Sequence, residues 1–138
     1  MSRVIHTQSP GKIRSHHRRT IAEALRRLSQ KRELDDEVKD LSAMIVFCMH
    51  EMADTIEQTT SAWEKRDYYL KADRFREKWR WLEPMTDQIS AVIYEQQWAQ
   101  LPDVLIQLMP HFSDISVKRL TREPVLWQGA YDRLMEGE

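Results

Sequence analysis

The sequence is poor in the residues that make turns and cross-links. Its 138 residues include one cysteine, 3 glycines and 5 prolines, and neither glycine nor proline occurs between Gly11 and Pro84. A single cysteine excludes an internal disulfide, and a β-sheet domain of this length would need several tight turns rich in glycine and proline. The sequence therefore predicts an all-α protein that needs no oxidising compartment.

Long apolar segments are also missing. The longest uninterrupted apolar run covers residues 43–49, whereas a membrane-spanning helix needs about 20 apolar residues. The first residues contain no apolar stretch of the kind found in secretory signals. We therefore expect no membrane span and a cytoplasmic location.

The length and the balance of apolar and charged residues indicate one domain with its own core. We predict a helical bundle of five to six helices with a long central helix pair. The bundle is expected to occupy residues 16–138. A basic, extended N-terminal arm, residues 1–15, is expected to precede it, because Ser9, Pro10 and Gly11 are typical of a turn or linker.

Apolar residues spaced three and four apart indicate where the helices lie. The first helix is expected to begin between Ser15 and Thr20 and the second near residue 35. The apolar stripe of the second helix goes out of phase with the next one, so we predict a bend or turn between about residues 59 and 67. A third helix then continues to residue 82. Prolines 84, 102 and 124 are typical of helix first turns, and residues 115–120 alternate like a short extended segment.

No arrangement of side chains typical of a catalytic or metal site is found. Di-iron bundles bind metal through Glu-x-x-His pairs, but Phe47 and Leu108 stand three positions before His50 and His111. Cys48 lies on the apolar stripe of the second helix and is interpreted as a core residue. We expect no metal and no cofactor, and a protein that is not an enzyme.

The charge is distributed unevenly along the chain. Residues 1–32 carry nine lysines and arginines against one acid, Glu23, a net charge of +8, and the rest of the chain sums to −9. Such a basic segment can follow a phosphate backbone or contact an acidic partner. The residues predicted to make these contacts are Lys12, Arg14, Arg18, Arg19, Arg26 and Arg27. Two alternatives stay open: the segment neutralises the protein's own acidic body, or it is a solvated tail.

Residues 63–82 interleave aromatic and basic side chains. Most of these aromatic residues fit the apolar stripe of the third helix, but Tyr69 and Trp81 do not. On one continuous helix Trp79 and Trp81 would point about 200° apart, so one of them is expected at an interface. We therefore predict Tyr69 and Trp81 as protein-contact residues, with a homodimer as one candidate assembly.

Together these features predict a non-catalytic accessory or interaction module that contacts nucleic acid or an acidic partner through its basic N-terminal segment. The alternative is a protein-binding helical adaptor or homo-oligomeric scaffold without a nucleic-acid role. An enzyme or metal-binding bundle with an unrecognised site is third. Salt distinguishes the first two, because only phosphate contacts weaken steeply as salt rises.

Overall fold

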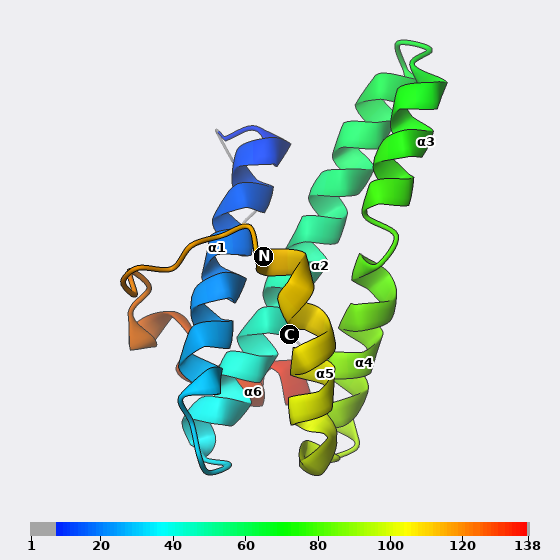
Figure 1. The fold of residues 1–138 in the computed structure, drawn as a ribbon. Coiled ribbons are helices and arrows are strands. Elements are labelled where there is room, and N and C mark those ends of the chain that lie inside the picture. The colour runs from blue at the N-terminus through cyan, green and yellow to red at the C-terminus, as the bar shows by residue number, and fades with distance from the viewer. Residues whose placement is uncertain (1–7, 138) are drawn as a thin grey trace.

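A computed structural model of the protein describes residues 8–137, whose regular structure is entirely helical (Figure 1). This confirms the all-α class. The segment 115–120 forms no strand. The helices in chain order are α1 (Pro10–Ser29), α2 (Asp36–Glu64), α3 (Tyr69–Lys78), α4 (Leu82–Tyr94), α5 (Leu101–Leu108) and α6 (Ala130–Met135), with the short 3-10 turns η1 (Trp98–Gln100), η2 (Met109–Phe112) and η3 (Pro124–Leu126).

Helix α1 begins earlier than the sequence predicted. Pro10 occupies its first turn, and the Ser9 hydroxyl caps it by accepting a hydrogen bond from the backbone N–H of Lys12 at 3.3 Å. Proline suits this position because its fixed φ is helical and its missing N–H is not needed there. The predicted start between Ser15 and Thr20 is therefore wrong, and residues 10–15 of the predicted arm are helical. Residues 1–7 of that arm lie outside the described residues.

The predicted break after the second helix is confirmed as a tight turn. Helix α2 ends at Glu64, Asp67 adopts a left-handed conformation with φ of 62°, and α3 returns antiparallel to α2. Aspartate tolerates this conformation better than most residues. Figure 1 shows the α2–α3 hairpin extending past the ends of the other helices. The long central helix pair is therefore a projecting hairpin, with its turn far from the rest of the bundle.

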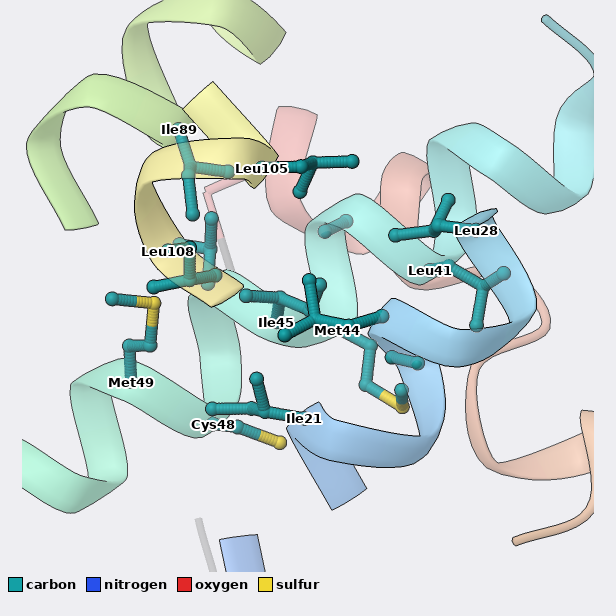
Figure 2. Close-up of a cluster of buried hydrophobic side chains, with 14 of the residues drawn as sticks. Ile21, Leu28, Leu41, Met44, Ile45, Cys48, Met49, Ile89, Leu105 and Leu108 are labelled. Carbon is teal, nitrogen blue, oxygen red and sulfur yellow. The ribbon is translucent and has the colours of Figure 1, made fainter. Parts of the chain in front are cut away.

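The core lies around the first half of α2. Helix α2 packs against α1 along one side and against α3, α4 and α6 on others. Figure 2 shows Ile21 of α1, Ile45 and Met49 of α2, and Leu108 of α5 pointing toward one another. These side chains are completely buried, and the apolar area they remove from water is the main source of stability.

The last helix is held by a side chain from α2. Gly129 precedes α6 in the left-handed region, with φ of 80°. The two carboxylate oxygens of Asp40 accept hydrogen bonds from the backbone N–H groups of Gly129 and Tyr131, at 3.1 and 3.0 Å. A carboxylate at a helix N-terminus satisfies free N–H groups and is favoured by the helix dipole. Asp40 thus fixes the C-terminal segment, whose Trp127 is buried in the core.

Cys48 lies in the core, as predicted, and should be chemically inert in the folded protein. Its side chain is buried, and this burial raises the pKa of the thiol to about 12. Because the thiolate is the reactive form, we expect Ellman's reagent to label less than one tenth of the protein in an hour at pH 8, and all of it in 6 M guanidinium. Rapid labelling without denaturant would show that α2 opens locally in the native state.

Candidate anion-binding surface

The guanidinium groups of four of the five arginines of α1 contact carbonyl or carboxylate oxygens of the same chain. Arg18 forms a two-pronged ion pair with Asp114, at 2.7 and 3.1 Å, and donates to the backbone carbonyl of His111 at 2.9 Å. Its hydrogen bonds hold the pKa of Asp114 below the usual range, and the nearby charge of Lys78 contributes further. Arg18 thus fastens α1 to the segment that follows η2.

Arg19 belongs to a buried network around Glu23. Residue Glu23 is only 1% exposed. Its carboxylate accepts hydrogen bonds from Arg19 at 2.8 Å, from the N–H and hydroxyl of Thr121 at 2.5 and 2.6 Å, and from the N–H of Arg122 at 2.8 Å. Burial alone would raise the pKa of Glu23, but these hydrogen bonds outweigh it and lower the pKa to about 2. The one acid of the basic segment is therefore the anchor for residues 121 and 122.

Arg26 and Arg27 also have partners within the chain. Arg26 donates to the backbone carbonyl of Val117. Arg27 lies 3.4 Å from a carboxylate oxygen of Glu37, and its guanidinium is 4.9 Å from the ring centroid of Trp127. Four of the six residues predicted to contact a partner are thus engaged internally. For these four, the contacts favour the alternative that basic residues neutralise and fasten the protein's own body.

Arg14, like Arg26, has no carboxylate partner among residues 8–137, but it differs in lying against aromatic side chains. Its guanidinium donates to the hydroxyl of Thr55 at 3.2 Å and lies 4.9 Å and 5.7 Å from the ring centroids of Phe75 and Trp79 on α3. Burial lowers the pKa of Arg14, which still carries its charge at neutral pH. An anion nearby would therefore stabilise this partly buried cation.

Arg14 lines an open hollow of about 560 Å³ between the N-terminal turns of α1 and the end of α3, together with Lys12, Ser15, Arg18 and Trp79. Lys12 is exposed at its rim. The indole N–H of Trp79 is buried and has no hydrogen-bond partner in the part of the chain that the structure describes. In Figure 1, the N-terminal half of α1 and α3 flank the distal half of α2. The hollow therefore holds two cationic groups, Lys12 and Arg14, that form no ion pair with any acid among residues 8–137.

Helix α3 carries three exposed bases between its first turn and its last. Lys71, Arg74 and Lys78 are three and four residues apart and so share one face of α3. Lys71 and Lys78 lie one turn before and one turn after Phe75, the ring that Arg14 covers. Within residues 8–137 none of the three forms an ion pair.

We call the set Lys12, Arg14, Lys71, Arg74 and Lys78 the basic face. Sequence analysis selected the first two of these residues and noted the bases interleaved in residues 63–82, but it assigned Lys71, Arg74 and Lys78 no contact role. In the structure the neighbouring acids pair with other bases of this segment: Glu64 and Asp73 with Arg76, and Glu77 with Arg80. The spacing of these three bases in the sequence was the signal that could have indicated a shared basic face on the third helix.

The two residues predicted as protein contacts have different environments. Trp81 stacks on His111, with 3.9 Å between ring centroids and 8° between the planes, and Tyr69 is 56% exposed. The predicted divergence of Trp79 and Trp81 is wrong, because α3 ends at Lys78 and residues 79–81 form a turn, which brings the two rings to 5.7 Å. Trp81 therefore already has an aromatic partner in the chain, whereas Tyr69 faces solvent.

Among residues 8–137, no group of three or more His, Cys, Asp or Glu side chains is placed to hold a metal ion. None of the helices described is both long and apolar enough to cross a bilayer. Comparison of the chain with protein-family models, curated proteins and solved structures found no significant match.

Proposed function

We propose that the protein is a non-catalytic helical module of the cytoplasm that binds nucleic acid through the basic face. The observation that carries this proposal is the state of Arg14. Its charge is partly buried beside the rings of Phe75 and Trp79 with no carboxylate of residues 8–137 as a partner, whereas Arg18, Arg19 and Arg27 each contact one. An external anion would supply the missing partner.

A chain of phosphates suits the basic face better than a single small anion. The five cationic groups are spread over two helices, from Lys12 on α1 to Lys71 near the start of α3. A polyanion neutralises such a row at several points, and the counterions it releases favour binding. An acidic protein segment is the competing ligand, and it lacks flat bases that could use the aromatic rings near this face.

The direct test is fluorescence anisotropy of labelled DNA and RNA, titrated with the protein at 50 and 200 mM salt. If the protein makes five phosphate contacts, its affinity should fall about 100-fold or more as salt rises from 50 to 200 mM. Replacing Lys12 by glutamate should weaken binding about tenfold at 50 mM salt and lower the salt slope by about 1. The matched control is Arg32→Glu, which makes the same charge change beyond the other end of α1.

Equal losses from Lys12→Glu and Arg32→Glu would contradict the proposal, because they would indicate a general effect of net charge. Absence of binding at 50 mM salt would contradict it more directly. If the protein binds an acidic peptide more tightly than every nucleic acid tested, the ligand of the basic face is an acidic protein segment.

A protein-binding role is the second candidate, and a separate surface favours it. A hollow of about 320 Å³ between the α1–α2 connection and α5 is lined by Leu34, Trp98, Leu105, Ile106 and Met109. Exposed apolar groups of this kind are typical of protein contacts. Association through this hollow, including homodimerisation, would be nearly insensitive to salt, so the same salt series separates the two functions.

A further inference from the structure

The outer end of the α2–α3 hairpin carries aromatic groups that the bundle does not use. Tyr68 and Tyr69 are 51% and 56% exposed, although Ala72, three residues further along α3, is completely buried. Together with Asp67, Leu70, Lys71 and Arg74 they line an open hollow of about 660 Å³. Two aromatic and two basic side chains therefore lie together at the beginning of α3, with the carboxylate of Asp67 on the turn beside them.

We infer that the ligand of the basic face is a single-stranded nucleic acid whose bases stack on Tyr68 and Tyr69. This inference rests on the proposed function and specifies its substrate class. The phosphates of the strand would follow Lys71, Arg74 and Lys78 along α3 and reach Arg14 and Lys12 at the other hollow. Proteins that bind single strands combine the same two elements, a row of positive charge and aromatic rings on which successive bases stack.

The tyrosines are the reason to choose a single strand over a duplex. In a duplex the faces of the bases are covered by their stacked neighbours, so exposed tyrosine rings gain nothing from it beyond the ends. In a single strand the bases can turn outward and stack on them. The stretch of α3 from Tyr69 to Lys78, which carries the ring and the three charges, is about 14 Å long at 1.5 Å per residue, and it accommodates several nucleotides.

An anionic membrane is the other surface that an exposed apolar and basic end could contact. Leu70, 62% exposed, would insert among the lipids in that case. However, a flat surface touching the turn of the hairpin would leave Lys78 and Arg14 roughly 15 Å away along α3. The charges extend along the helix instead of forming a ring at its tip, so they match a strand better than a plane.

The test uses the full chain and three labelled probes of about 12 nucleotides: a single strand of thymidines, an abasic strand of equal length, and a duplex. We expect the single strand to bind about tenfold or more tightly than the abasic strand at the same salt. The double variant Tyr68→Ala, Tyr69→Ala should weaken single-strand binding about tenfold or more and leave abasic binding unchanged. Tyr94→Ala, which removes a half-exposed tyrosine at the end of α4, is the matched control and should change neither affinity; circular dichroism checks that each variant keeps its helicity.

The outcomes separate the inference from the proposal beneath it. Equal, salt-sensitive binding of all three probes, unaffected by the tyrosine variant, would overturn the single-strand inference and leave the nucleic-acid function standing. No salt-sensitive binding of any probe would overturn both. Binding to phosphatidylglycerol vesicles that is lost on Leu70→Ala, with none to the single strand, would assign the hairpin end to a membrane and overturn the inference.

Discussion

Replacing Glu23 by glutamine should lower the free energy of unfolding by about 3 kcal/mol at pH 7, more than any surface substitution. The carboxylate is buried and accepts hydrogen bonds from Arg19, from Arg122 and twice from Thr121. Glutamine keeps the shape but not the charge, and its amide N–H₂ would face donors where an acceptor is needed. Urea unfolding followed by far-ultraviolet circular dichroism measures the loss.

The same carboxylate should make stability depend on pH below 5. Its pKa is lowered to about 2 in the folded protein from an ordinary value of 4.5. A lowered pKa means that the ionised form stabilises the fold: the stabilisation is complete above about pH 4.5 and is lost as pH falls toward 2. A shift of this size corresponds to about 3 kcal/mol. The Glu23→Gln variant should lack this part of the pH dependence.

The matched control is Glu37→Gln, which removes a carboxylate from a half-exposed ion-pair cluster with Lys31 and Arg27. Exposed ion pairs contribute little, so this change should cost less than about 1 kcal/mol. If the two variants lose equal stability, or if Glu23→Gln retains the acid transition of the parent, the buried network is not the anchor of residues 121 and 122.

Local sequence patterns predicted the helices well and the distant contacts poorly, for a physical reason. The change of phase after α2 located the hairpin turn, since the positions of side chains around a helix depend only on nearby residues. The partners of Arg18 and Glu23 are Asp114 and Thr121, which lie more than 90 residues away. Nothing in the residues near α1 indicates such a pairing.

The start of α1 shows how one motif can support two interpretations. Ser9 and Pro10 are as typical of a linker as of a helix cap and first turn. The structure selects the cap, because Ile13, Ile21 and other apolar residues of α1 can then lie on one continuous helix against α2. Whether Ser9 and Pro10 form a linker or a helix start thus depends on the packing of α1 against α2, which begins about one turn further along the chain. As a result, Lys12 and Arg14 are held in place on a helix instead of belonging to an arm.

The decisive comparison for function uses two double variants, each of which removes two positive charges: one from α3 and the other from α1. Lys71→Ala with Lys78→Ala should weaken single-strand binding about 10- to 100-fold at 50 mM salt and lower the salt slope by about 1.4, the value for two lost phosphate contacts. The free energy of unfolding should fall by about 1 kcal/mol or less. Both lysines are exposed and neither forms an ion pair within residues 8–137, but Lys71→Ala removes the contact of its ammonium with the Trp63 ring, whose centroid is 4.4 Å away. Anisotropy and urea unfolding of the same samples give the two quantities.

Arg18→Ala with Arg19→Ala removes the same charge and should do the reverse. Because these arginines hold Asp114 and Glu23, stability should fall by about 2–4 kcal/mol, while affinity measured well below the melting temperature should change less than about threefold. If both pairs weaken binding equally, affinity follows net charge and the basic face has no contact role. If only the arginine pair weakens it, the basic side of α1 is the contact surface and its internal ion pairs open on binding. A loss confined to the lysine pair supports the assignment of the nucleic-acid surface to α3, since equal charge was removed and only position differed.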